Sequence, residues 1–321
     1  MRTLLTALVA LIAAVAAPSS PGAQTYPVRP ITLVVPFAPG GATDLVARVI
    51  AQNLRKELGQ SVVVENRPAA GGTVAIGNVA KGPADGYTLL LCGTNLVINP
   101  HLRKLRYDPL TDLAPVALVA DGPEIIAVSA SLPVNNLKEF IAAVQAAPGK
   151  FNYGTPGVGT LPHLIGDHFA RMIGAQMVHV PFKGSAAAMT EVAAGRVQMS
   201  IATQASVQPF ADAGKAKLLA VASPQRLATL RDVPTTSEAG LPDYEFSNWF
   251  GVVAPAGTSP EIVNRLNAVL QKMFLEPENV APLTRQGIIP VRQSVAHFDA
   301  HLRKESQRWK DVVTAAGVRL E

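Results

Sequence analysis

The stretch LVVPFAPGGATDLVARVIAQNL, from Leu33 to Leu54, joins a short apolar run to an amphipathic segment through the adjacent glycines Gly40 and Gly41. The apolar run has the length and β-branched content of a buried strand. After the glycines, apolar residues recur at helical spacing, with Asp44 early in the segment and Gly59 at its end, as helix termini favour. The stretch therefore predicts a strand, a glycine turn and the N-terminus of a helix.

The same alternation of short apolar runs and helical patterns extends from Ile31 to about Ala222. It is typical of βαβ units with a parallel sheet. One apolar segment, PVALVADGPEIIAVSA at 115–130, interrupts the alternation and is interpreted as a pair of strands. The apolar runs before and after this interruption form two series of similar length, which predicts two α/β lobes.

The composition changes after the second series. Residues 224–260 are rich in proline and turn residues, and amphipathic helices follow from Ser259 and from Ser294 to Ala316. We interpret this as a return of the chain to the first lobe, so that two strands cross between the lobes as a hinge. The predicted first lobe comprises residues 24–122 plus 223–321, and the predicted second lobe comprises residues 123–222.

The first 23 residues have the pattern of a secretory signal peptide, with Arg2 followed by an uncharged run from Leu4 to Ala17 and then small residues and prolines. The run is shorter than the roughly 20 residues that span a bilayer. We expect cleavage near Gln24 and an exported mature protein.

Charge and cysteine content exclude several classes of protein. The net charge of +5 is scattered, and no aromatic side chain lies inside the densest basic run, HLRKLR at 101–106, so we expect no nucleic-acid partner. The single cysteine, Cys92, lies in an apolar run and is interpreted as a small buried side chain. It permits neither an intramolecular disulfide nor a cysteine cluster for zinc, and we predict no metal and no cofactor.

The glycine turn PFAPGGATD, at 36–44, is the first candidate binding element. Its glycines allow close approach of a ligand to the backbone, and the free N–H groups at a helix N-terminus favour an anion such as a carboxylate or phosphate. The turn lacks the lysine of a P-loop and does not match G-x-G-x-x-G, which disfavours nucleotides. A plain tight connection is the alternative, and Asp44 stabilises the helix dipole even without a ligand.

A second glycine loop, NYGTPGVGTLPHL at 152–164, also follows a predicted strand and precedes a helix. In open α/β sheets ligands bind beyond the carboxyl ends of the strands, so two such loops on two lobes are expected to face each other across a cleft. Other predicted strand ends add hydroxyl, amide and ammonium groups: Thr94, Asn95, Lys183, Ser185, Thr203 and Gln204. This set suits reversible capture of a small polar molecule.

The sequence offers no catalytic pattern. It contains neither G-x-S-x-G nor H-E-x-x-H. His163 and Asp167 share a predicted helix face, but surface or capping roles are commoner than metal binding, and His179 is interpreted as a structural histidine. We therefore predict a binding protein and no enzyme. Two alternatives stay open: an exported hydrolase or isomerase, and a ligand sensor for a membrane receptor.

A resemblance to a known family covers nearly the whole mature chain. The segments YPVRPITLVVPFAPGGATDLVAR, VVVENRPAAGGTVAIGNVAKGPADGYTLL, FNYGTPGVGTLPHL, HVPFKGSAAAMTEVAAGRV and VPTTSEAGLPDYEFSNWFGVVAPAGTSP occur in this order. Together they resemble the Bug family of receptors for tripartite tricarboxylate transporters. The resemblance implies a monomeric periplasmic solute-binding protein of the type II periplasmic-binding-protein fold. It further implies that the two lobes close on a small carboxylate and that the partners are the membrane subunits of such a transporter.

The resemblance also implies a set of ligand-binding residues. On the first lobe these are Phe37, Gly40, Gly41, Thr43, Asp44, Ala70, Thr94 and Asn95. On the second lobe they are Thr155, Gly157, Gly159, His163, Phe182 and Lys183, and the strand-end residue Thr203 completes the predicted set. Many relatives place an Asp-Asn pair where this chain has Ala202 and Thr203, so an acid that pairs with a ligand amine is missing here. We therefore expect a carboxylate without an ammonium group.

Overall fold

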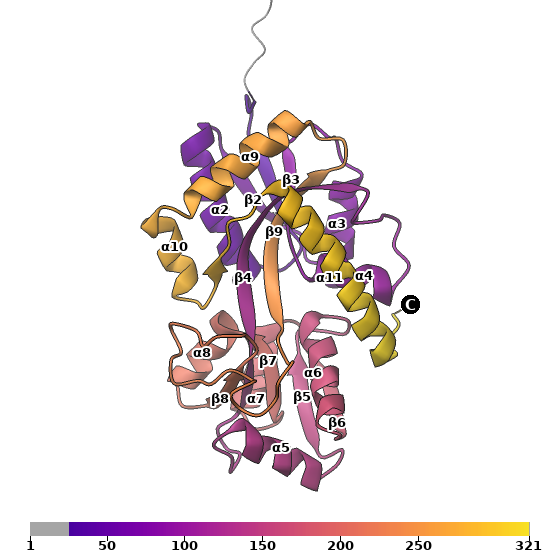
Figure 1. The fold of residues 1–321 in the computed structure, drawn as a ribbon, viewed down its shortest axis with the longest axis vertical. Helices are drawn as coiled ribbons and strands as arrows, with labels where there is room; N and C mark the ends of the chain where they lie inside the picture. The colour runs from indigo at the N-terminus through magenta and orange to yellow at the C-terminus, as the bar shows by residue number, and fades with distance from the viewer. Residues whose placement is uncertain (1–25, 321) are drawn as a thin grey trace, which may run out of the picture.

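The computed structural model describes residues 26–320 and has two α/β lobes, one above the other in Figure 1. The predicted signal peptide lies outside the described residues. Ten strands form one sheet, whose main path has the order β2-β1-β3-β9-β4-β7-β5-β6, while β8 and β10 both pair with β4. The predicted α/β class and the two-lobe arrangement are confirmed.

The first lobe contains one half of this sheet. Its strands are β1 (Ile31–Val35), β2 (Val62–Asn66), β3 (Thr88–Gly93), β9 (Ser247–Pro255) and β10 (Ile289–Pro290). Its helices are α2 (Ala42–Leu58), η1 (Ala70–Gly72), α3 (Thr73–Ala80), α4 (Asn95–Leu102), α9 (Pro260–Met273), α10 (Pro277–Thr284) and α11 (Val295–Ala316). The buried faces of β1, α2 and α9 pack in one apolar cluster, which explains the helical spacing of apolar residues after the glycine turn.

The second lobe contains the other half of the sheet. Its strands are β5 (Phe151–Thr155), β6 (Met177–Pro181), β7 (Met199–Thr203) and β8 (Ala216–Val221). Its helices are α5 (Leu137–Ala146), α6 (Leu161–Met172), α7 (Ser185–Ala193) and α8 (Gln204–Asp212). Strand β5 is parallel to β6 and β7, as the alternating pattern predicts.

One strand belongs to both lobes. Residues Leu113–Ser129 form a single strand, β4, which pairs with β9 in the first lobe and with β7 and β8 in the second. The predicted pair of strands at 115–130 is therefore wrong. Gly122 and Pro123 continue the strand, since both are buried and paired with β9, and the strand absorbs its irregularities as register shifts. Figure 1 shows β4 and β9 running side by side from one lobe toward the other.

The proline-rich stretch contains two features that its composition concealed. Strand β9 lies inside it and is a central strand of the first lobe. The preceding residues 223–246 pack with the second lobe: Thr236 donates its amide hydrogen to Val221, and the Tyr244 hydroxyl donates to the carbonyl of Ile165. The lobe boundary predicted at residue 223 therefore differs from this packing. The apolar side chains of residues 223–246 cover the outside of α6 and β8 before the chain enters the first lobe at β9.

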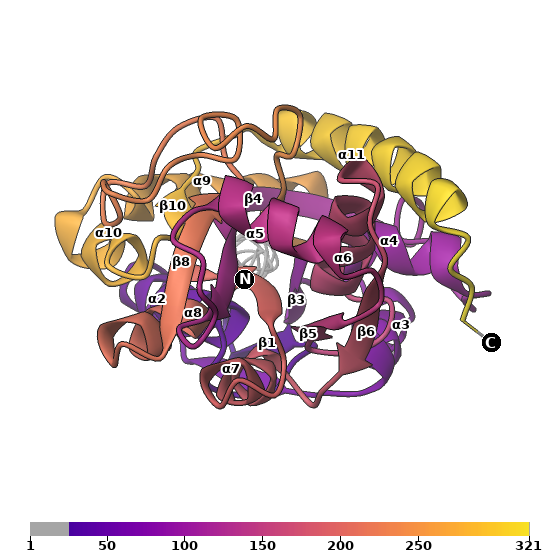
Figure 2. The same cartoon turned by 90° about the horizontal axis from the view of Figure 1, so that it is seen from below.

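Helix α11 connects the lobes on one side of the molecule. It packs against α4 and β4 in the first lobe and against α6 in the second, where Arg171 donates to the carbonyl oxygen of Ala315. Figures 1 and 2 both show this long yellow helix extending past α4 toward α6. Its contact with β9 is close, since a Cβ on Gly251 would lie 2.2 Å from the Phe298 ring. Within residues 26–320, each helix is too short or too polar to cross a lipid bilayer.

Candidate functional site

The strand register places the two glycine loops on opposite sides of the hinge. In the first lobe, Gly93 at the end of β3 lies opposite Phe250, which lies opposite Ala120 of β4. In the second lobe, Thr203 at the end of β7 lies opposite Glu124 of the same strand. Because β3 runs in the direction of β4 and β7 runs against it, the two carboxyl ends point toward each other. They are four residues apart along β4, or about 13 Å.

The loops that follow β1 and β5 share this geometry. Strand β1 pairs in parallel with β3, so the glycine turn after Val35 begins at the level of the hinge. Strand β5 pairs in parallel with β7, with Gly154 opposite Ser200, so the second glycine loop begins near the same level from the other side. The two loops that the sequence singled out therefore face each other across the short span between Ala120 and Ile126.

The glycine turn of the first lobe is exposed, and it leaves the N-terminus of helix α2 without a side-chain cap. Residues 38–41 are exposed, and Gly40 has a φ of +89°, which favours glycine. Gly41 is the N-cap residue of α2 with an extended backbone, and no side chain caps the helix. The first amides of α2 have no acceptor within the helix. They are therefore available to an anion, as the sequence predicts.

Asp44 stabilises this turn through hydrogen bonds of its carboxylate. Its Oδ2 accepts hydrogen bonds from the Gly40 amide at 3.1 Å and from Arg48 Nε at 2.9 Å, and its Oδ1 accepts from Asn66 Nδ2 at 3.1 Å. Burial raises the pKa of Asp44, but these hydrogen bonds outweigh it and leave the pKa below its ordinary value. Both carboxylate oxygens, and the Gly40 amide, are thus occupied within the protein.

Asn66 is a residue that the sequence analysis missed. Its side-chain amide also donates to the carbonyl oxygen of Phe37 at 3.1 Å, so it ties the beginning of the glycine turn to the end of β2. Its place at the carboxyl end of a strand was a usable signal. Thr43 is buried in the first turn of α2, whereas Phe37 is half-buried at the beginning of the turn.

A second turn, at Ala70–Gly72, lies beside the first, with Ala70 and Gly71 exposed and Gly72 buried. The carbonyl oxygen of Gly71 accepts hydrogen bonds from Asn95 Nδ2 and Asn99 Nδ2, each at 3.2 Å. Gly72 has a φ of +91°, and a Cβ there would lie 2.9 Å from Pro36, which brings the two turns into contact. Asn95 therefore supports the turn that carries Ala70, together with Asn99, which the sequence analysis did not single out.

Thr94 lies at the hinge. It is fully buried, and its hydroxyl lies 3.3 Å from both the carbonyl oxygen of Ser247 and Oδ1 of Asn248. These two residues begin β9, where the chain enters the first lobe. Thr94 thus links the end of β3 to the hinge.

The second glycine loop is braced by two histidines. The Thr155 side chain is fully buried, and its hydroxyl lies 2.6 Å from Nε2 of His179 on β6. The Gly157 amide approaches the same hydroxyl at 3.3 Å. The Gly159 amide donates to Nδ1 of His163 at 3.1 Å. The structural interpretation of His179 is thus consistent with these contacts, and the Gly157 and Gly159 amides are both engaged within the loop.

The remaining predicted residues of the second lobe surround this loop. Phe182 donates its amide hydrogen to the carbonyl of Thr155 at 2.9 Å and packs its ring against Gly154. Lys183 follows it and is exposed. Thr203 is buried at the N-cap of α8, and its methyl group lies within reach of Gly122 in the hinge strand.

Two acidic side chains lie in the hinge itself. Glu124 is 2% exposed, and its Oε2 has no hydrogen-bond partner among the described residues. Burial, together with the nearby Asp121 carboxyl, raises the pKa of Glu124 to about 8. Asp121 also has a pKa above its ordinary value because of burial. The Glu124 carboxyl is therefore largely protonated at neutral pH.

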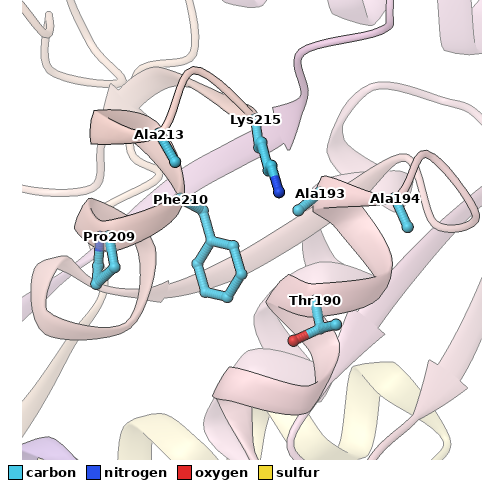
Figure 3. Close-up of a pocket in the computed structure, with 7 residues that line it drawn as sticks. All are labelled: Thr190, Ala193, Ala194, Pro209, Phe210, Ala213 and Lys215. Atoms are coloured by element: carbon cyan, nitrogen blue, oxygen red, sulfur yellow. The ribbon is translucent and has the colours of Figure 1, made fainter.

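A hollow of about 380 Å³ lies elsewhere, between α7 and α8 on the second lobe. Figure 3 shows the Phe210 ring and the Lys215 side chain directed into it, with Thr190, Ala193 and Ala194 on the facing helix. Neither glycine loop contributes to its lining. The hollow is therefore separate from the candidate site.

The chain is similar to known proteins along most of its length. The family model described as "Tripartite tricarboxylate transporter family receptor" matches residues 46–318. Protein BugT of Bordetella pertussis is 36% identical over 302 residues, which cover 93% of each chain.

Solved structures are similar over the same length. A protein of R. palustris with adipate is 37% identical, with a TM-score of 0.86 over 92% of this chain and 99% of that one. MatC from Rhodopseudomonas palustris with bound malate is 33% identical, with a TM-score of 0.81 over 90% and 100% of the two chains. Periplasmic binding protein BugD is 33% identical, with a TM-score of 0.84 over 92% and 100%.

Proposed function

Because the chain belongs to the receptor family of the tripartite tricarboxylate transporters, the family of the Bug proteins, we propose that it captures a small carboxylate between its lobes. The proposed role is delivery of that acid to the membrane subunits of such a transporter. The protein acts as a periplasmic monomer and performs no chemistry on the ligand.

The observation that carries this proposal is the uncapped N-terminus of α2 behind exposed glycines, facing the second glycine loop across the hinge. Backbone amides at a helix N-terminus bind carboxylates well. Adipate and malate in the two solved relatives support an acid of this size. The ligand-binding residues that we propose are the fifteen predicted from Phe37 to Thr203. The two lobes divide near residue 122 and, because residues 223–246 pack with the second lobe, near residue 246.

The contacts divide these residues by role. Backbone amides after Gly40 meet the ligand carboxylate. Thr94, Asn95 and Thr155 shape the loops, since their side chains are hydrogen-bonded inside the protein. Exposed Lys183 attracts the anion as it approaches.

We further propose that the ligand carries no ammonium group. Asp44 is the acidic side chain at the glycine turn, and both of its oxygens are engaged by Gly40, Arg48 and Asn66. Releasing it to pair with an amine breaks several of these hydrogen bonds. Its position therefore favours a simple carboxylate over an amino acid.

A thermal-shift screen of the mature protein tests the proposal. The panel contains succinate, malate, adipate and benzoate, with aspartate and glutamate as amino-acid counterparts. A specific acid is expected to raise the melting temperature, because a ligand that binds only the folded state stabilises it. Mass spectrometry of the acid released afterwards is expected to find it unchanged.

Three outcomes contradict parts of this function. No shift with any carboxylate removes the binding role. Tight binding of aspartate or glutamate, with no effect of the simple acids, removes the argument from Asp44. Conversion of the acid favours the alternative of an exported enzyme. Uptake of the labelled acid in cells lacking this protein separates transport from the remaining alternative, a ligand sensor.

A further inference from the structure

His163 lies where helix α6 meets the second glycine loop, and its protonation state is fixed by its neighbour. The Gly159 amide can only donate, and it lies 3.1 Å from Nδ1 of His163. Nδ1 is therefore an unprotonated acceptor, and the ring hydrogen is on Nε2. An imidazolium has no acceptor, so protonation of His163 removes this hydrogen bond.

The neighbouring His179 does not have this constraint. Its Nε2 lies 2.6 Å from the Thr155 hydroxyl, which can rotate to donate or to accept. When Nε2 is protonated, the Thr155 hydroxyl can accept from it and donate to the Gly157 carbonyl, 3.3 Å away. The contact at Gly159 is thus the one that depends on a neutral ring.

The surroundings disfavour a charge on either ring. The two imidazoles stack with centroids 3.9 Å apart. Burial lowers the pKa of His163, and burial together with the charge of His163 lowers the pKa of His179 to about 4.

No acidic side chain among the described residues pairs with the two rings. Tyr153 of β5 faces His179 with ring centroids 5.1 Å apart. On α6, Asp167 is paired with Arg171, and His168 stacks on Tyr244. From the first lobe, the apolar side chains of Leu102 and Leu320 pack against the loop at Gly159.

We propose that His163 is a positioning residue, whose neutral ring holds Gly159 and thereby the 155–160 loop in the conformation that binds the carboxylate. Protonation of His163 then frees the Gly159 amide and weakens binding. The inference rests on the proposed capture of a carboxylate in this loop. It adds that ligand affinity falls in mild acid for a reason that lies in the protein and not in the ligand.

Two substitutions distinguish the role of the hydrogen-bond acceptor Nδ1 from that of the space that the His163 ring fills. His163→Asn retains an oxygen acceptor close to the position of Nδ1 and cannot be protonated near neutral pH. His163→Leu fills similar space without an acceptor. His168→Asn on the same helix is the matched control, because His168 lies outside the candidate site. Circular dichroism and the melting temperature establish that each variant is folded.

The first measurement needs no ligand. Amide hydrogen exchange at Gly159 and the 15N spectrum of His163 are followed from pH 7 to pH 5. Relative to the intrinsic base-catalysed rate at each pH, exchange is expected to be about tenfold faster in His163→Leu than in His163→Asn, and faster in the wild type at pH 5 than at pH 7. Equal exchange in all three proteins, or a protonated Nδ1 at pH 7, overturns the proposal. If His163→Leu does not fold, the wild type and His163→Asn decide it through the pH dependence.

The second measurement is titration calorimetry with adipate, malate and succinate. Affinity is expected to fall about tenfold in His163→Leu at pH 7. Between pH 7 and pH 5 it is expected to fall more in the wild type than in His163→Asn, where only protonation of the ligand contributes. Equal affinity of the wild type and His163→Leu overturns the positioning role. If the wild type binds none of the panel acids, the proposed function fails, while the exchange measurement still decides whether His163 holds the loop.

Discussion

Replacing Glu124 by glutamine is expected to remove a large part of the pH dependence of stability. Glutamine has the shape of the protonated carboxyl and does not ionise. Glu124 is buried in the hinge strand with Oε2 unpartnered, and its pKa is about 8 in the folded protein against an ordinary value of 4.5. Between these two values the folded state binds more protons than the unfolded state. Stability therefore falls as the pH rises through this window.

The magnitude follows from the two pKa values. Linkage predicts that ionisation of Glu124 costs about 3 kcal/mol of unfolding free energy between pH 5 and pH 8. At about 2 °C per kcal/mol for a chain of this size, the difference in melting temperature is about 6 °C. At pH 5 the two proteins should differ by less than about 1 kcal/mol, since Glu124 is then neutral in the folded state.

Urea denaturation at pH 5, 6, 7 and 8 measures this directly. Glu245→Gln is the matched control, because Glu245 is an exposed carboxylate on the neighbouring segment that leads into β9, next to Phe246, whose carbonyl accepts from the Glu124 amide. The free energy of unfolding of Glu124→Gln minus that of the wild type should grow with pH, and the control difference should stay flat. The same pH slope in the wild type and in Glu124→Gln refutes the reasoning, because Glu124 is then ionised in the folded protein.

Three further substitutions, the last combined with a compensating one, test the loops and the packing of α11. Gly41→Val should weaken binding of the acid chosen by the screen at least tenfold, by shielding the α2 amides. It should not lower the melting temperature, since Gly41 has a φ of −89° and open space around a Cβ; unchanged affinity contradicts this account of the turn. Thr155→Ala should cost about 1 to 2 kcal/mol in urea denaturation, because it leaves His179 Nε2 without its 2.6 Å partner. Gly251→Ala should cost about 1 to 3 kcal/mol through the 2.2 Å clash with Phe298, and Phe298→Leu should recover part of it; additive losses contradict the clash.

The sequence predicts the α/β lobes well because its periodicity is local. The helix after the glycine turn begins beside Gly41 and ends before Gly59, whose φ is +68°. Ser259 and Ser294 are N-caps, and their hydroxyls accept from residues three positions on. Cys92 is fully buried, as predicted. Each of these features depends on neighbours within one or two turns.

The features that the sequence does not predict depend on distant partners. Gly122 and Pro123 are typical of a break, yet β9 pairs with them and continues the strand. Residues 223–246 have the composition of a free loop, but they cover the second lobe with buried side chains such as Leu227 and Tyr244.

The hydrogen bonds inside the candidate site are also not predicted by the sequence, even where the partners are close along the chain. Glycines and hydroxyls mark the loops correctly as elements, whereas the sequence does not say which amides are already engaged. That Gly40 donates to Asp44 and Gly159 to His163 depends on side-chain directions in the folded protein. Asn66 and Asn99 were missed because each acts on a turn more than twenty residues away.

The position of Leu320, beside the second glycine loop, has a practical consequence for experiments. Leu320 donates its amide hydrogen to the carbonyl of Leu102 at 2.8 Å, and its side chain packs over Gly159. A purification tag or fluorescent protein fused after residue 321 therefore starts beside the second glycine loop and adds its bulk there. A fusion at the mature N-terminus avoids this, since the chain enters the first lobe at Tyr26, whose hydroxyl is bonded to Gly86. For a biosensor, the two attachment points are thus not equivalent: the C-terminal one is coupled to the loop and the N-terminal one reports only on the first lobe.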